Sequence, residues 1–297
     1  MERAFSLDTS DARILMELDQ LYRKLNTPLK TRLKFLEKNS NLVESRDDLY
    51  LECITLYNLT GQYKTAKDLL ASYKFHPWEG GEGKVVGQYL VTHIELAKQA
   101  IEEENYEDAL QLLHAAEHYP SNLGEGKLFG AQENDIHYLK GMALEKLGRE
   151  QEAMHAFLTA TKGITEPVQA IFYNDPQPDK IFYQGLAWHK LNQPEKALQV
   201  FQKLKAFGEA HINDNISIDY FAVSLPDLLV FDTDLNLRNK IHCLYLMGLG
   251  CLGIGNGHTE EADKYFDEVL MLDVSHQGAI IHKLMKDYVW FVEQEQD

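Results

Sequence analysis

Residues Ile136 to Gly163, with the sequence IHYLKGMALEKLGREQEAMHAFLTATKG, decide the fold of this chain. Apolar residues recur three and four positions apart on both sides of Gly148, which is the spacing of two amphipathic helices. Gly148 lies where the first helix should end, because glycine accepts the left-handed backbone of a tight turn. Gly141 and Ala153 are small enough to let the two helices approach closely. Since neither helix buries its apolar face alone, the pair should stack on copies of itself.

Copies of this pair are visible along the chain as three features in a fixed register. The first is a position in each second helix that is alanine in most copies: Thr31, Ala66, Ala109, Ala153, Ala197 and Ala262. The second is a large apolar residue four positions later: Phe35, Leu70, Leu113, Phe157, Phe201 and Phe266. The third is a turn before each position, such as Thr60-Gly61-Gln62-Tyr63. The register predicts helix pairs at 11–40, 45–73, 88–118, 134–163, 178–207 and 238–273.

This pattern resembles the tetratricopeptide repeat, a helix-turn-helix unit of about 34 residues. Gly141 and Gly185 match the small residue of its first helix, and Gly61 with Tyr63 matches its turn. Asp19 departs from the pattern, because it occupies the small position of the first pair. The resemblance implies an all-α fold, a right-handed α-α superhelix in which the helix pairs form a solenoid.

We expect residues 1–297 to form one such solenoid domain with long inter-repeat insertions. Residues 1–10 resemble the tail of an upstream repeat, which predicts that the chain is part of a larger protein. Residues 276–293 have the pattern of one amphipathic helix, which we expect to cap the last pair.

Two of the insertions share a glycine-rich sequence. His76 to Lys84 is HPWEGGEGK, and Pro120 to Lys127 is PSNLGEGK. A phosphate-binding loop needs GxxxxGK followed by Ser or Thr, which neither stretch has. We therefore expect glycine-rich turns that let the next helix start at a new angle. The candidate ligand-binding residues in the first insertion combine an aromatic ring that stacks on sugars with polar groups that bond hydroxyls: Trp78, Glu79, Glu82 and Lys84.

The longest insertion, 207–238, contains the apolar segment YFAVSLPDLLVF at 220–231. This segment should pack on the solenoid, as a buried extended segment or as a short helix starting near Pro226. Together with the PWEGGEGK insertion, it resembles the repeat region of large bacterial proteins that carry a sugar-related domain of uncharacterised function on the N-terminal side. The resemblance implies a role in carbohydrate metabolism and locates no catalytic residue in the repeats.

Composition argues against several classes of function. The net charge is −17, with 29 Lys and Arg against 46 Asp and Glu, whereas a nucleic-acid partner requires clustered basic residues. No apolar run approaches the ~20 residues of a membrane span, and the N-terminus lacks the apolar core of a signal peptide. Cys53, Cys243 and Cys251 lie in apolar helical patterns, which indicates buried thiols in a reducing compartment and predicts a cytoplasmic location.

One pattern suggests metal chemistry. His114-Ala115-Ala116-Glu117-His118 matches HxxEH, in which two histidines four positions apart share a helix face and Glu117 would act as a base. Ala116, however, fills a core position of the repeat, and no third ligand is identified. No nucleophile elbow is present either. We therefore predict no metal, no cofactor and no catalytic residue in this chain.

Repeat solenoids usually bind their ligands along the concave face, which the first helices line. The register places a row of candidate binding residues there: Leu51, Ile94, Lys98, Tyr138, Met142, Phe182, Leu186 and Tyr245. Such an aromatic and aliphatic groove suits an extended apolar peptide, a docking helix or a stacked sugar. The alternative is that these residues pack beneath the inserted loops.

These observations predict a non-catalytic interaction or scaffolding module. It would hold a partner protein, a peptide or a neighbouring domain of its parent chain. The alternative is a repeat region that shapes part of the site of a carbohydrate-processing enzyme or assembly. A third reading is an independent metalloenzyme at His114 and His118.

Overall fold

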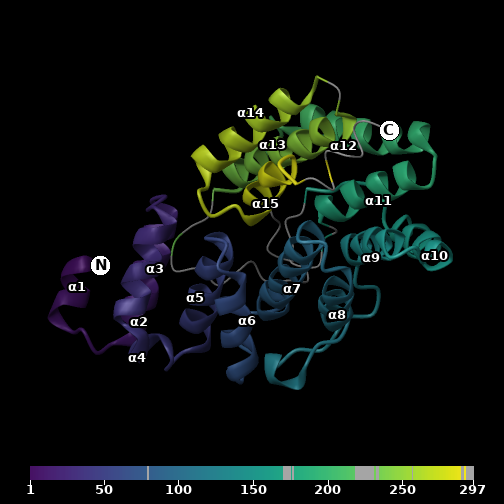
Figure 1. Cartoon of the computed structure of the whole chain (residues 1–297). Coiled ribbons are helices and arrows are strands. Elements are labelled where there is room, and N and C mark those ends of the chain that lie inside the picture. Colours follow the sequence, from purple (N-terminus) through teal and green to yellow (C-terminus); the bar gives the residue numbers. More distant parts are fainter. Residues whose placement is uncertain are drawn as a thin grey trace.

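The chain forms an all-α helical repeat solenoid, as predicted (Figure 1). The computed structural model describes residues 1–78, 80–169, 175, 177–217, 231, 234–255, 257–288 and 291. Its helices are α1 (Glu2–Leu7), α2 (Ala12–Lys24), α3 (Leu29–Lys38), α4 (Ser40–Val43), α5 (Asp47–Leu59), α6 (Tyr63–Ser72), α7 (Lys84–Glu102), α8 (Tyr106–Ala116), η1 (Ser121–Leu123), α9 (Asn134–Lys146), α10 (Glu150–Ala160), α11 (Pro178–Lys190), α12 (Pro194–His211), α13 (Leu235–Ile254), α14 (Thr259–Leu272) and α15 (Gln277–Met285). The described residues contain no strand.

The pair α9–α10 shows how the sequence closes each hairpin. A Cβ atom on Gly141 of α9 would lie 2.4 Å from the ring of Phe157 on α10, so only glycine allows this approach. The same contact recurs between Gly185 and Phe201 and between Gly248 and Phe266. The small position of the first helix and the large position of the second are therefore two halves of one contact.

Side-chain amides of first helices bond the last carbonyls of second helices, both within a pair and between adjacent pairs. Asn134 of α9 donates to the carbonyl oxygens of Ala160 and Lys162, both at 2.7 Å, where α10 ends. Asn239 of α13 donates to the carbonyl of His211, the last residue of α12, at 2.8 Å. These bonds satisfy carbonyl groups that a helix end leaves without partners.

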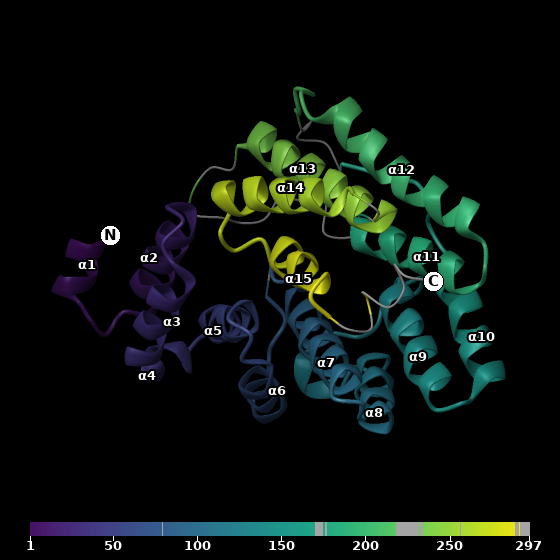
Figure 2. The same ribbon diagram turned by 45° about the horizontal axis from the view of Figure 1, so that its top comes forward.

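The two ends of the solenoid meet. In both views the helix pairs follow an arc that brings α2 and α3 beside the end of α14 (Figures 1 and 2). Asn26, in the turn between α2 and α3, donates to the carbonyl of Leu272 at 2.9 Å and accepts from the amide of Val274 at 3.2 Å. The first pair thus bonds the end of α14 in the way that neighbouring pairs bond each other.

The predicted terminal helix packs on the last pair, mainly on α14, but it is shorter than predicted. α15 ends at Met285, residues 286–288 are not helical, and positions 289–290 and 292–293 lie outside the described residues. The helix does not extend the solenoid beyond α14. It turns back to the inner side of the arc, between α13–α14 and α5–α7 (Figure 2). Part of the reason is close packing, because a Cβ atom on Gly278 would lie 2.5 Å from the Tyr245 hydroxyl.

Parts of the longest predicted insertion can be placed. α12 continues to His211, beyond its predicted end at 207, and α13 begins at Leu235. Residues 218–230 and 232–233 lie outside the described residues, so the segment 220–231 stays a prediction apart from Phe231. Among the helices that the structure describes, none is both long enough and apolar enough to span a membrane.

Candidate interaction site

The concave row predicted from the sequence is buried rather than open. Tyr138 and Phe182 are fully buried, with 0% exposure, and the most exposed of the eight residues is Ile94 at 6%. The expectation of an accessible groove is therefore wrong for this state of the chain. Part of the physical reason is that α15 covers Phe182 and Tyr245 through the ring of His282.

His282 of α15 is the centre of this packing. Its ring makes edge contacts with Phe182, Tyr183 and Tyr245, at centroid distances of 5.5, 6.0 and 5.8 Å. Nδ1 lies 3.0 Å from the Tyr245 hydroxyl and 2.9 Å from the carbonyl oxygen of Gly278. Nε2 is buried and has no hydrogen-bond partner. Burial, followed by the charge of Lys98, lowers the pKa of His282 to about 3, so the ring is neutral at pH 7.

Lys98 lies in the same interior and does not face a free groove. Its ammonium donates to Glu95 at 2.7 Å and lies 5.8 Å from the centre of the Tyr183 ring. Burial opposes its charge, but Glu95 outweighs this effect and raises the pKa of Lys98. The only basic residue of the predicted row therefore belongs to a buried ion pair within α7.

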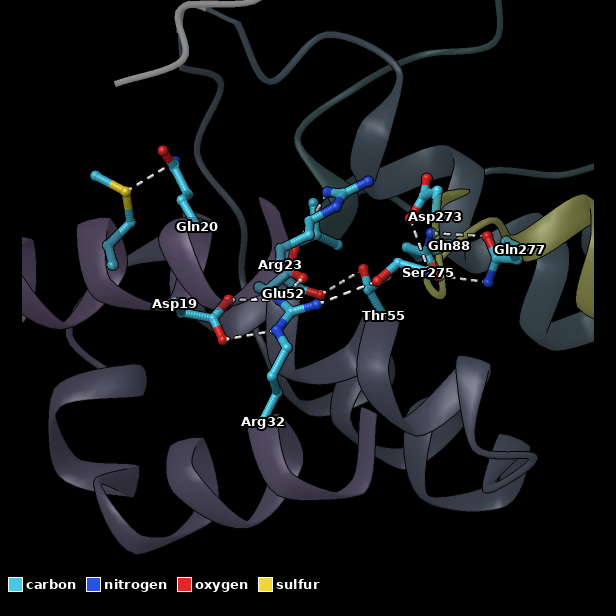
Figure 3. A network of polar contacts seen from close by, with 12 residues as sticks. Asp19, Gln20, Arg23, Arg32, Glu52, Thr55, Gln88, Asp273, Ser275 and Gln277 are labelled. Carbon is cyan, nitrogen blue, oxygen red and sulfur yellow. Dashed lines mark hydrogen bonds and ion pairs between the residues drawn. The ribbon is translucent and has the colours of Figure 1, made fainter. Parts of the chain in front are cut away.

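A second polar network joins the two ends of the chain (Figure 3). The guanidinium of Arg32 is fully buried and donates to Asp19 at 2.6 and 3.1 Å and to Glu52 at 2.5 Å. It also donates to the Ser275 hydroxyl at 3.3 Å, directly before α15. Burial and the charge of Glu52 raise the pKa of Asp19 to about 6, although Arg32 opposes this shift. Asp19, the departure from the repeat pattern, is thus the partner of a buried arginine.

The two glycine-rich insertions lie against each other. Gly83 of the first donates its amide hydrogen to Glu125 of the second at 2.8 Å. The amide of Phe75 bonds the carbonyl of Asn122 at 2.8 Å. The two Gly-Glu-Gly-Lys sequences therefore form one surface element between α6, α7 and α8.

The candidate binding residues of the first insertion differ in their exposure. Trp78 is half-buried, and a Cβ atom on Gly81 would lie 2.3 Å from its ring, so one side of the indole is covered. Glu82 and Lys84 are exposed. Glu79 lies outside the described residues.

All three cysteines are buried free thiols, as the sequence predicts. Burial first, together with nearby charge, raises the pKa of Cys53 and of Cys251 to about 12, so neither is a reactive thiolate. Cys251 lies close to His258 and Glu261. Glu261 is already held by His258 at 2.9 Å and by Lys205 at 2.9 Å. These contacts, His258 first, lower the pKa of Glu261 to about 2, which indicates a satisfied polar cluster.

Sequence reasoning missed His282, Arg32 and Ser275. Arg32 carried a readable signal, because it lies on the helix that follows Asp19 and is buried with Leu33 and Leu36 on the apolar side of α3. His282 carried no such signal in the sequence. Its contacts depend on where α15 packs, which the pattern of α15 does not reveal.

A comparison with protein families finds a match at one helix pair. The family model of the tetratricopeptide repeat matches residues 135–162, which are α9 and α10 with the turn that joins them. The matched segment contains the contact between Gly141 and Phe157 that the other pairs repeat. The chain therefore contains a tetratricopeptide repeat at residues 135–162, within an all-helical solenoid.

Proposed function

We propose that the chain is a non-catalytic protein-interaction module whose concave face accepts an amphipathic helix. One observation carries the proposal: α15 already lies on that face, with the His282 ring against Phe182 and Tyr245. Helix-in-groove recognition uses a few residues spaced three or four apart on one helix face. Gly278 and His282 have this spacing, and both contact Tyr245.

The partner helix would share the features that seat α15. It would carry a small residue opposite Tyr245 and, four positions later, a neutral ring that fits beside Phe182. Such a helix belongs to another protein or to a neighbouring domain of the parent chain, and it competes with α15. Because α15 is covalently attached, its effective concentration is high, so partner binding requires displacement.

A peptide added to a shortened chain tests the proposal. A chain ending at Asp273 should bind a labelled peptide of residues 274–288, measured by fluorescence anisotropy, while circular dichroism confirms that the shortened chain is helical. A His282→Glu peptide should bind at least about tenfold more weakly, because a buried unpaired charge is costly. A Leu284→Gln peptide serves as the matched control, because Leu284 is an exposed residue of α15. A folded chain that ignores the native peptide, or that binds the His282→Glu peptide equally well, would sink the proposal.

A second candidate function is a contribution to a carbohydrate site of a parent protein. It is supported by the joined glycine-rich element, which places half-buried Trp78 near exposed Glu82 and Lys84. The exposed part of this half-buried indole would contact a sugar ring. Unchanged sugar turnover of the parent protein after Trp78→Ala would count against this role.

A further inference from the structure

The HxxEH pattern at the end of α8 places three ligand groups together on the surface. His114 and His118 are exposed, and their ring centroids lie 4.5 Å apart. Potential ligand atoms of His114, Glu117 and His118 all lie within 4.8 Å of one another. Ala116, by contrast, has 0% exposure. The residue that packs the repeat and the residues that could hold an ion therefore lie on different sides of the helix.

The backbone orients one of these imidazoles. Nδ1 of His118 lies 2.8 Å from the carbonyl oxygen of His114, a contact that requires a hydrogen on Nδ1. The lone pair of the ring is then on Nε2, the nitrogen that would bind an ion. A hydrogen bond from the other ring nitrogen is the usual support of a metal-binding histidine.

The next helix pair brings two more groups to Glu117. Nδ1 of His137 on α9 lies 3.8 Å from Oε1 of Glu117, so a third imidazole stands beside the cluster. Nζ of Lys140 lies 2.5 Å from Oε2 of the same carboxylate. The lysine is a competing cation, whereas Oε1 faces the histidine. No pattern within α8 could have indicated His137, because the tertiary packing of α9 supplies it.

We propose that His114, Glu117 and His118 form a surface site for a divalent transition metal of the zinc class, with His137 available as a further ligand. Imidazole nitrogen and carboxylate oxygen are ligands that zinc, nickel and copper accept, whereas magnesium and calcium prefer all-oxygen sites. The site is independent of the concave face and of the proposed helix partner. It requires that Lys140 give up or share the carboxylate.

The Cys251, His258 and Glu261 cluster is the internal comparison. Its thiol belongs to a residue with 0% exposure, and Lys205 and His258 already hold its carboxylate. The surface cluster offers open approach to an ion, and its His118 ring is oriented by a backbone carbonyl. We therefore assign metal binding to the surface cluster.

Titration of the full chain with zinc chloride tests this assignment. After treatment with a chelator, isothermal calorimetry should show one zinc ion bound per chain with micromolar affinity, and cobalt should give the same stoichiometry. His118→Ala should weaken binding at least about tenfold, as loss of a ligand or its support does. Lys140→Met should tighten binding, because it removes the competing cation.

Two controls keep the result specific. His155→Ala removes an exposed histidine from α10, and Cys251→Ala removes the thiol of the other cluster; neither should change zinc affinity. Circular dichroism of each variant establishes that it is folded. The assignment is overturned if the His114→Ala/His118→Ala double variant binds zinc as tightly as the native chain, if native chain binds none, or if Cys251→Ala abolishes binding.

Discussion

At the scale of single residues, the contact between Gly141 and Phe157 sets how closely two helices pack. Gly141→Ala would put a methyl group 2.4 Å from the ring, so ring or helix must shift. Overpacking of this kind costs about 1–3 kcal/mol. We expect the free energy of unfolding, measured by urea denaturation, to fall by that amount.

Gly87 provides the matched control for this substitution. It lies inside α7, and a Cβ atom there would meet nothing within 4 Å. Gly87→Ala should therefore stabilise the chain by roughly 0.5–1 kcal/mol, because alanine is the better helix former. If both alanine variants shift stability in the same direction, the close approach at Gly141 is not what limits the hairpin.

The buried Arg32 gives a second prediction at this scale. Arg32→Met leaves Asp19 buried beside Glu52 without its cation. Removal of one partner of a buried ion pair costs about 3–5 kcal/mol. The double variant Asp19→Leu/Arg32→Met should lose much less, because no unpaired charge stays inside. Equal losses in the single and double variants by thermal denaturation would contradict the pairing.

Repeated residues could be predicted from the sequence, and unique ones could not. Gly141 and Gly185 were identified because each holds the same register position in its pair. Gly248 makes the same contact but was not identified. Asp19 was identified as a departure, but its meaning depends on Arg32 and Ser275, which come from other parts of the fold.

At the scale of elements, the packing of α15 should make the stability of the chain depend on pH through His282. The folded chain holds the pKa of this ring at about 3, below its usual value of 6.5. The unfolded chain therefore takes up a proton first, so stability falls as pH drops from 6.5 towards 3. Between pH 7 and pH 5 the loss from this group is about 2 kcal/mol, at 1.36 kcal/mol per unit.

Other titratable groups also contribute to the pH dependence of the free energy of unfolding. The contribution of His282 is therefore measured by comparing variants. His276, whose pKa burial lowers to about 4, acts in the same direction as His282. Asp19, with a pKa raised to about 6, acts in the opposite direction, because its folded form binds the proton first. His282→Gln should remove its share of the pH dependence measured by urea denaturation, and His155→Gln should not. If the free energy of unfolding of His282→Gln depends on pH as steeply as that of the native chain, the ring is not buried in solution.

The existence of α15 followed from its apolar periodicity, but its position did not. Periodicity reports that a helix has an apolar face, not which surface covers that face. The aromatic row of the first helices and the apolar face of α15 were both visible in the sequence. That His282 of α15 packs on Phe182 and Tyr245 of this row was not visible.

At the scale of the whole molecule, the turn at Asn26 holds the two ends together. Asn26→Gly keeps the positive φ of 54° but removes both side-chain bonds to the end of α14. One lost hydrogen bond costs ~1 kcal/mol, so the Val274 amide should exchange its hydrogen about fivefold faster. Asn192→Gly is the control, because Asn192 has a φ of 55° in an exposed turn. Equal exchange in both variants would mean that the ends do not meet.

The position of α15 on the inner side of the arc can be measured directly by crosslinking. Gln277 of α15 bonds Gln88 of α7 through their side-chain amides at 3.1 Å, although 189 positions separate them (Figure 3). A photoreactive benzoylphenylalanine at position 277 of the full chain should therefore crosslink to α7, as identified by mass spectrometry of the digested protein. The same group at exposed Leu284 should not reach α7. Crosslinks from position 277 that reach only α13 or α14 would place the helix as a cap on the last pair and contradict the filled concave face.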